Sequence, residues 1–336
     1  MDQEKEKRLL SISVSPHIRS DEDTRSIMAD VLIALVPALG VAAYMFGIRA
    51  ILVTVISCAA CVFFEWAWCR LMKKPNSVGD LSAVVTGTLL AYCLPVTIPI
   101  WVLIIGDFFA IIIVKELFGG LGKNFMNPAL AGRVFLFSWP VFMNTWTVPL
   151  SYTSFFQVSG LDAVTSATPL ASMANGVLPE GITLLQNFLG QVGGSLGEVS
   201  TFALLLGGIY LLIRRVITLR IPLSFLLTVA VLGFLFPQGN ERLSWTAWQL
   251  ISGGVVLGSI FMATDYSTSP VNPTAQIVYG IGCGLLTVFI RWFGAYAEGV
   301  SYAILIMNAT VWLLDKALPR KRFGAVKEKK AKEAAK

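Results

Sequence analysis

Long apolar runs alternate with short polar connections along most of the chain. A helix that spans a membrane needs about 20 apolar residues. Several of the runs are short and contain glycine, which indicates helices packed inside a bundle. The pattern predicts an all-α polytopic membrane protein with about ten transmembrane helices. Their expected ranges are 28–47, 51–69, 80–95, 97–117, 129–143, 199–213, 221–236, 247–262, 275–290 and 300–314.

The composition favours the same class of protein. Of the 336 residues, 55% are hydrophobic and only 14% are charged, whereas soluble domains carry about 25% charged residues. A soluble globular domain, a secreted disulfide scaffold, a disordered chain and a nucleic-acid-binding domain are therefore disfavoured. We expect membrane lipid, and no nucleic acid, among the partners.

Basic residues are distributed unevenly between the two sides of the expected bundle. If the ten helices alternate in direction, 23 of the 26 lysines and arginines fall on the side of the N terminus, among them Lys115 and Arg133. Basic residues accumulate on the cytoplasmic side of membrane proteins, so we predict that both termini are cytoplasmic. The expected organisation is a tail at 1–27, a membrane domain at 28–318 and a basic tail at 319–336.

One connection, at residues 145–198, is long, rich in Ser, Thr and Gly, and contains no Lys or Arg. The alternation of helices predicts that this loop is extracytoplasmic. Within it, Pro169 favours an extended conformation at Thr168. An extended threonine beside the small Ala167 is a suitable acceptor for an enzyme that attaches a group to a hydroxyl. An ordinary loop rich in Ser and Thr is the alternative interpretation.

The segment Asp162-Ala163-Val164-Thr165-Ser166-Ala167-Thr168 resembles the flavin-attachment motif of the RnfD/NqrB family of membrane subunits. Other segments resemble the same family in order along nearly the whole chain, at 15–18, 80–87, 118–129, 297–300 and 307–310. The resemblance implies that Thr168 carries FMN through a phosphoester bond, which a flavin transferase makes outside the cytoplasm. The other residues of the attachment motif are Asp162, Thr165, Ser166 and Ala167.

The resemblance implies one component of an Rnf-type complex in a bacterial or archaeal cell (inner) membrane, which is not catalytic alone. Such a complex transfers electrons between ferredoxin and NAD and translocates Na⁺ or H⁺. The implied partners are a flavin-bearing G subunit, the membrane A and E subunits, and the soluble B and C subunits. Thr168-Pro169-Leu170 and the chain length favour the RnfD branch. The alternatives are an NqrB-type component of a Na⁺-translocating NADH:quinone oxidoreductase and a secondary transporter without a redox cofactor.

The segment 118–128 lies at the inner end of the fourth expected helix. Its glycines let the backbone approach another element closely, and Pro128 suits the first turn of a helix. One interpretation is a breakpoint that lines an ion path or holds a second, non-covalent flavin such as riboflavin, and the other is a tight turn between helices. The segment 264–273 also ends in Asn-Pro, although this pattern does not establish a repeat. The candidate residues are Gly119, Gly120, Asn124 and Asn127.

Three ionisable residues are candidates for the ion pathway, because charged groups within a membrane domain are costly and are often functional. Asp107 falls near the middle of the fourth expected helix, and the resemblance to NqrB points to Glu116 and Asp315. Asp315 could instead remain at the interface or pair with Lys316. For Glu65 we favour such a structural role, at the interface or paired with Arg70.

No metal site is predicted. Cys58-x-x-Cys61 lacks a second pair of ligands, and the odd number of cysteines, five, indicates buried thiols rather than a disulfide framework. His17 is the single histidine of the chain, and the sequence contains no P-loop or dinucleotide-binding fingerprint.

Overall fold

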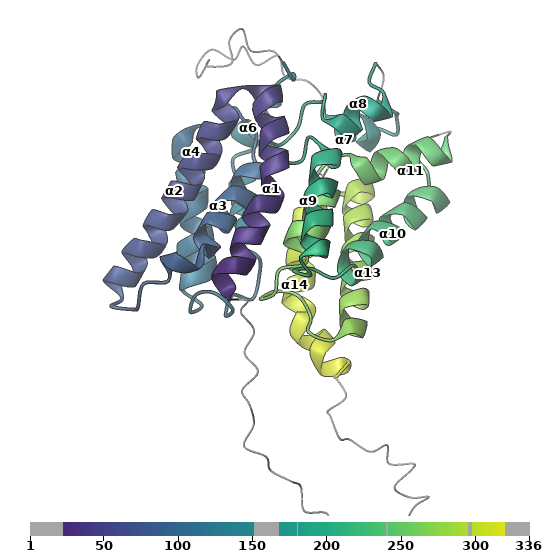
Figure 1. Ribbon diagram of the computed structural model, residues 1–336. Helices are drawn as coiled ribbons and strands as arrows, with labels where there is room; N and C mark the ends of the chain where they lie inside the picture. The colour runs from purple at the N-terminus through teal and green to yellow at the C-terminus, as the bar shows by residue number, and fades with distance from the viewer. Residues whose placement is uncertain (1–22, 151–167, 180, 240, 295–297, 320–336) are drawn as a thin grey trace, which may run out of the picture.

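The computed structural model describes residues 23–150, 168–179, 181–239, 241–294 and 298–319. Within these ranges the chain forms helices and no β-strand, and each of the ten expected segments contains helix (Figure 1). The α-helices are α1 (Thr24–Phe46), α2 (Ile48–Leu71), α3 (Ser82–Tyr92), α4 (Ile100–Phe108), α5 (Pro128–Leu136), α6 (Pro140–Met143), α7 (Pro169–Ala174), α8 (Leu184–Leu189), α9 (Thr201–Ile213), α10 (Arg220–Leu235), α11 (Arg242–Ile251), α12 (Val255–Leu257), α13 (Pro273–Phe293) and α14 (Val300–Ala317). One 3₁₀-helix, η1 (Val78–Asp80), and two π-helices, η2 (Phe109–Glu116) and η3 (Gly258–Met262), complete the order.

The helices differ in whether their length suits a membrane crossing. Among the described residues, α1, α2 and α13 are long and apolar enough, and α11 with α12–η3 is a further candidate that bends by 60° at its break. Helices α3, α9 and α10 are apolar but shorter. The expected helix 129–143 is interrupted, because α5 ends at Leu136 and α6 begins at Pro140. The helical character of the segments is confirmed, and the number of crossings stays a prediction.

Small residues bring the helices into close contact. On α9, a methyl group at Gly207 would overlap the carbonyl oxygen of Ala34 on α1. On α3, a Cβ atom at Gly87 would lie 2.9 Å from the Cα of Cys58 on α2. Such positions let helix backbones approach each other closely, as is common in membrane bundles. These glycines therefore set the spacing of the pairs α1–α9 and α2–α3.

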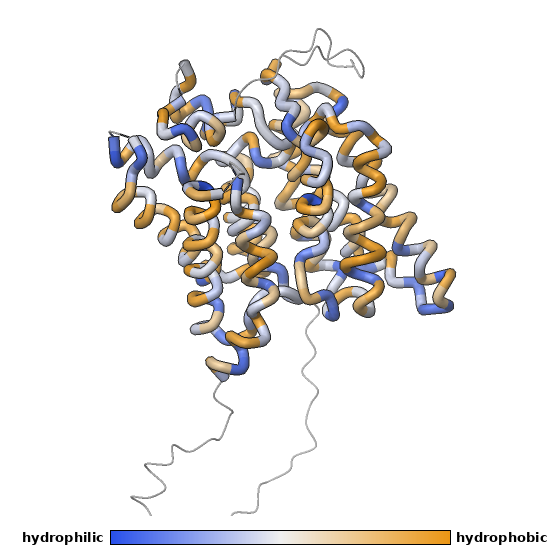
Figure 2. The backbone as a smooth tube through the Cα atoms, turned by 180° about the vertical axis from the view of Figure 1, so that it is seen from behind, coloured by the Kyte–Doolittle hydropathy of each residue, from blue (hydrophilic) through white to orange (hydrophobic). Residues whose placement is uncertain are grey.

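Apolar side chains also cover the outside of the bundle. Figure 2 shows apolar residues along the helices, with hydrophilic residues more frequent toward the helix ends. Large apolar side chains such as Val36, Ile209 and Phe289 are more than half exposed. A soluble monomer rarely leaves such extensive apolar surface in water. The surface is that of a protein embedded in lipid or covered by partner subunits.

The two ends of the bundle carry different elements. The start of α1 and the end of α14 lie at one end, which we name the α1 end (Figure 1). The short helices α7 and α8 lie at the opposite end, which we name the α7 end. Both helices belong to the expected loop 145–198. These described helices of the expected loop therefore lie opposite the start of α1, while the orientation in a membrane stays a prediction.

Arg133 on α5, only 2% exposed, ties three parts of the chain together. Its Nη1 lies 2.6 Å from Glu198 Oε1, and its Nη2 lies 2.6 Å from Glu298 Oε2. The N–H of Gly254, beside the break between α11 and α12, donates to Glu298 Oε1. Buried charges are tolerated when their neighbours satisfy them. This group of Arg133, Glu198 and Glu298, named the Arg133 cluster, holds the bent helix against α5.

Two of the basic residues counted on the cytoplasmic side are not surface charges. Arg133 lies in the buried cluster, and Lys115 on η2 is 2% exposed and pairs with Glu65. Counting charges along the sequence treated both as flanking residues, because their partners lie on other helices. The bias in basic residues is therefore weaker evidence for the orientation than the count of 23 suggests.

We expect Arg133→Gln to destabilise the fold strongly, because Glu198 and Glu298 would remain buried without the guanidinium that pairs with both of them. Removing one partner of a buried ion pair costs about 3–5 kcal/mol. Thermal unfolding of the detergent-solubilised protein should show a large fall in Tm.

Arg214→Gln is the matched control for this variant. The side chain of Arg214 is 51% exposed and lies 3.1 Å from Asp30, and exposed pairs contribute about 0–1 kcal/mol. Its Tm should change little. Equal losses of Tm in the two variants would contradict the role assigned to the Arg133 cluster.

Candidate functional site

Thr168 is the N-cap of α7, at the α7 end of the bundle. Its backbone is extended, with φ −69° and ψ 151°, which confirms the conformation expected before Pro169. The side-chain oxygen accepts a hydrogen bond from the N–H of Ala171 at 3.3 Å, and the residue is partly exposed. The hydroxyl is thus held at a defined place near the surface. The remaining motif residues, Asp162, Thr165, Ser166 and Ala167, lie outside the described residues.

The first turn of α7 packs onto the bent helix beside the Arg133 cluster. Leu170 and Met173 are buried with Trp245 and Trp248 of α11. Leu170 also fills the space next to Gly253, where a Cβ atom would additionally approach Glu298 Oε1. Apolar burial of this kind stabilises about 1.5–3 kcal/mol per large side chain. The threonine is therefore fixed relative to the bundle through α7.

A second basic residue, Arg291 on α13, is buried at the same place. It donates to the carbonyl oxygen and side-chain oxygen of Gln249, at 2.7 and 2.6 Å, and to the carbonyl oxygen of Ser252 at 3.0 Å. The sequence analysis selected none of Arg291, Glu198 and Glu298 as site residues. Their partners are distant in sequence, so no local pattern could reveal them.

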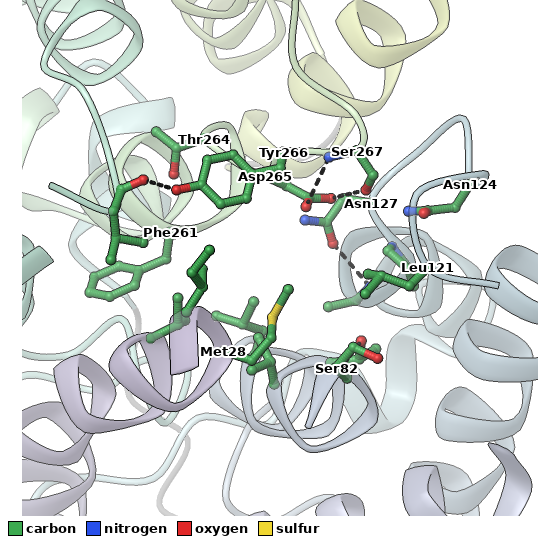
Figure 3. A pocket seen from close by; sticks show the side chains of 18 of the residues that line it. Met28, Ser82, Leu121, Asn124, Asn127, Phe261, Thr264, Asp265, Tyr266 and Ser267 are labelled. Carbon is green, nitrogen blue, oxygen red and sulfur yellow. Dashed lines mark hydrogen bonds between the residues drawn. The ribbon is translucent and has the colours of Figure 1, made fainter. Parts of the chain in front are cut away.

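A pocket lies between the two halves of the chain (Figure 3), and Ile27 and Met28 at the start of α1 are among the residues that line it. Asn124 and Asn127 line it from the connection before α5, and Asp265 and Ser267 line it from the connection after η3. The structure thus brings two of the four candidate residues of segment 118–128, Asn124 and Asn127, into one cavity. The remaining lining is largely apolar, with Met28, Leu121 and Phe261 among its members. Apolar walls with a few convergent polar groups are typical of ligand sites.

The two asparagines of the pocket differ in whether their side-chain atoms have hydrogen-bond partners. Asn127 caps α5, accepting from Ala129 N at 3.0 Å, and donates to Met262 O at 3.3 Å. Asn124 Oδ1 is buried and has no hydrogen-bond partner within the described ranges. It is a vacant acceptor of the kind that a bound polar ring could satisfy.

Asp265 is the acidic group of this pocket. Its carboxylate accepts from the hydroxyls of Ser267 and Thr268, at 3.0 and 3.1 Å. Burial raises the pKa of the Asp265 carboxyl, and these hydrogen bonds oppose that rise. Sequence reasoning quoted the segment 264–273 but did not select this residue. The sequence feature that could have pointed to Asp265 is the Asn272-Pro273 pair, which begins α13 in the same way as Asn127-Pro128 begins α5.

Gly119 and Gly120 do not line the pocket. Both have positive φ, 115° and 89°, and they form the turn after η2. Glycine is favoured there because a side chain is strained in this conformation. The interpretation of a tight turn therefore accounts for these two glycines, whereas Asn124 and Asn127 face a cavity.

The three acidic candidates for an ion path are not brought together. Asp107 is fully buried on α4, and Glu116 is 3% exposed at the end of η2. Asp107 Oδ2 and Glu116 Oε1 are buried without hydrogen-bond partners in the part of the chain that is described. Asp315 is partly exposed on α14, where it accepts from the N–H of Val271 at 3.3 Å.

The interpretation of Glu65 was wrong. Glu65 is fully buried and does not reach the interface, and its Oε2 lies 2.8 Å from Lys115 Nζ rather than beside Arg70. Ser77 also donates to its other oxygen. Arg70 is exposed at the end of α2. The error arose because α2 turns this face toward η2, a contact between residues 50 positions apart.

The model of the NQR2, RnfD, RnfE family matches residues 11–324. The chain is 46% identical to the D component of the Na⁺-translocating ferredoxin:NAD⁺ oxidoreductase complex of Acetobacterium woodii, covering 97% of this chain and 98% of that protein. It is 41% identical to the D component of the proton-translocating ferredoxin:NAD⁺ oxidoreductase complex of Clostridium ljungdahlii, covering 95% and 97%. It is 38% identical to the D component of the ion-translocating oxidoreductase complex of Stutzerimonas stutzeri, covering 91% and 93%. The chain belongs to the NQR2, RnfD, RnfE family.

Proposed function

We propose that this chain is the flavin-carrying membrane D component of an Rnf-type complex, which transfers electrons between ferredoxin and NAD and couples this transfer to Na⁺ or H⁺ translocation. The similarity over nearly the full length to relatives that bear the name of this component carries the proposal. It also favours this role over an NqrB-type component. The names of two relatives specify different ions, Na⁺ for one and protons for the other.

The position of Thr168 supports covalent attachment of FMN. The hydroxyl is partly exposed, begins a helix that is anchored by buried leucine and methionine, and lies at the end of the bundle opposite the start of α1. An ester oxygen at this position can still accept the hydrogen bond from Ala171. The bound FMN would supply the electron-carrying chemistry, while the protein supplies its position and electrostatic surroundings.

The pocket at the α1 end is the candidate site for a second, non-covalent flavin. Asn124 Oδ1 is an unused acceptor, and Asn127 and Asp265 provide further polar groups among apolar walls. The pocket is built from connections in both halves of the chain, so a ligand there would contact both. The G, A, E, B and C subunits of the complex would supply the donors and acceptors of electrons that this chain lacks.

Expression with a flavin transferase should give a covalent yellow fluorescence on a denaturing gel, and Thr168→Val should abolish it, because valine has no hydroxyl to esterify. The matched control is Thr183→Val. Thr183 is also an N-cap threonine in the connection between α5 and α9 and is exposed. The control should keep the fluorescence. Fluorescence that survives Thr168→Val, or none in the unaltered chain, would reject the attachment site.

Glu116→Gln and Asp315→Asn should lower ion transport by vesicles that contain the whole complex more than they lower flavin loading. The amides carry no negative charge, and a loss of about 1.4 kcal/mol of attraction to the ion lowers its affinity about tenfold. Flavin loading is read from gel fluorescence. Equal losses of loading and transport would indicate a folding role for these residues.

A further inference from the structure

Buried polar residues follow one face of α2. Ser57, Cys61 and Glu65 are spaced four residues apart, so they lie above one another on the helix surface. All three are 0% exposed. Opposite them, α4 and η2 carry two further buried groups, Asp107 and Lys115. Polar groups are expensive inside a membrane bundle and mark functional paths by default.

The geometry around Ser57 indicates the protonation state of Asp107. Ser57 Oγ lies 2.9 Å from the carbonyl oxygen of Gly87 and 2.6 Å from Asp107 Oδ1. A hydroxyl has one hydrogen to donate, so it can serve only one of these acceptors. If Ser57 donates to Gly87, the short contact with Asp107 needs a hydrogen from the carboxyl group. A protonated Asp107 that donates to Ser57 satisfies both contacts.

The rest of the surroundings agrees with a neutral carboxyl group. Within the described ranges, Asp107 Oδ2 has no hydrogen-bond partner. Besides the contact with Ser57, the only hydrogen bond of this carboxyl group in those ranges comes from Cys61 Sγ to Oδ1 at 3.3 Å. An ionised carboxylate without a counter-charge is far more costly to bury than a neutral carboxyl.

The charged side chains on the elements packed against α4 are paired elsewhere or point away. Glu65 on α2 pairs with Lys115 on η2, and Arg133 on α5 belongs to its own cluster. Glu116 on η2 faces the turn at Gly120. The titratable neighbours that face Asp107 are the thiols of Cys58 and Cys61.

A chain of hydrogen bonds connects Glu65 to the α1 end. Lys115 Nζ lies 2.8 Å from Glu65 and 2.6 Å from Ser82 Oγ. Ser82 Oγ in turn lies 2.6 Å from Asp80 Oδ1, in the connection between α2 and α3. Asp80 is partly exposed, and the neighbouring Gly79 is exposed. Groups that exchange protons with water are thus linked to a pair buried inside the bundle.

One apolar turn of α2 separates the polar residues around Asp107 from the Glu65–Lys115 pair. From Cys61 to Glu65 the helix rises about 6 Å, and this interval is packed by Ile111, Ile112 and Ala83. Ile111 and Ile112 belong to the π-helix η2, a conformation that is rare and frequent at functional sites. Beyond Asp107 toward the α7 end, the fully buried Val102 and Leu103 follow on α4. The route from the α1 end to Asp107 therefore contains more polar side chains than the route from the α7 end.

We propose that Asp107 is a proton-binding site that exchanges protons with the α1 end through the Glu65–Lys115–Ser82–Asp80 chain, with Ile111 and Ile112 as a closure between them. The proposal rests on the proposed function, because it assigns an ion-binding group to the coupled complex. In the step itself a hydronium ion loses one O–H bond, its proton forms an O–H bond with the Asp107 carboxylate, and a water molecule remains. The ion is a proton rather than Na⁺, because hard cations require several oxygen ligands and one neighbour here is a thiol.

The test is the reaction of the intact complex in membrane vesicles with dicyclohexylcarbodiimide, an apolar reagent for buried protonated carboxyl groups. The carboxyl adds across a C=N bond of the reagent, its proton moves to nitrogen, and rearrangement gives a stable N-acylurea. Peptide mass spectrometry locates the adduct. We expect labelling at Asp107 and none at Glu65, since Glu65 is equally buried but both of its carboxylate oxygens already have partners, Lys115 and Ser77.

Sided changes of pH test the access route. Raising the pH at the α1 end should lower the labelling of Asp107 by about tenfold for each pH unit once the carboxyl is mostly ionised, whereas raising it at the α7 end should have no effect. Asp107→Asn should lose the label. Asp30→Asn should keep the label on Asp107, because Asp30 lies elsewhere, on α1, where it pairs with Arg214 at the end of α9.

Three outcomes would overturn the proposal: no label on Asp107, protection of Asp107 by Na⁺, or a response to pH at the α7 end. The labelling requires neither flavin nor ferredoxin. Failure of the proposed function would appear instead as missing fluorescence at Thr168 with Asp107 still labelled, so the two failures are distinguishable.

Discussion

The contact of Arg133 with Glu198 and Glu298 is the constraint on which the arrangement of the bundle depends. A guanidinium and two carboxylates can remain buried only if each finds its partners, and these come from α5, from the connection before α9 and from the connection before α14. Glu298 also accepts the N–H of Gly254 at the break of the bent helix. The same cluster thus satisfies the interrupted backbone and joins the first half of the chain to the second.

The position of α7 depends on the Arg133 cluster. Leu170 packs where Gly253 leaves room beside Glu298 and Arg291, so the helix that begins at Thr168 is placed by the bent helix beneath it. Irregular backbone inside a membrane protein is tolerated where protein covers it. Here three irregular positions, the break at Gly254 and the π-helices η2 and η3, lie beside the proposed flavin and proton sites.

Lys115 connects the two inner sites. Its ammonium group pairs with Glu65 on α2, and the residue also lines the pocket that contains Asn124, Asn127 and Asp265. A change of charge in that pocket would act on the Lys115–Glu65 pair at close range, because the Coulomb interaction is strong where water is excluded. The polar face of α2 and the proposed flavin pocket are therefore physically adjacent, which offers a route by which electron transfer and proton binding could influence each other.

The sequence by itself determined the helical elements and the local backbone at Thr168, the residue proposed for attachment. Apolar runs predicted helix in all ten segments, Pro169 set the extended backbone of Thr168, and Asn127-Pro128 marked the start of α5. These properties depend on neighbouring residues, so they can be derived from local sequence. Only the tertiary structure decided the partners of the buried charges. Glu65 was assigned to the interface or to a pair with Arg70, although it pairs with Lys115. Arg133 was counted among the basic residues on the cytoplasmic side, although it is buried and its partners lie 65 and 165 residues away. Hydrophobic periodicity defines a helix and its apolar character, but it does not specify which helix a polar face meets, because that depends on the packing of the whole bundle.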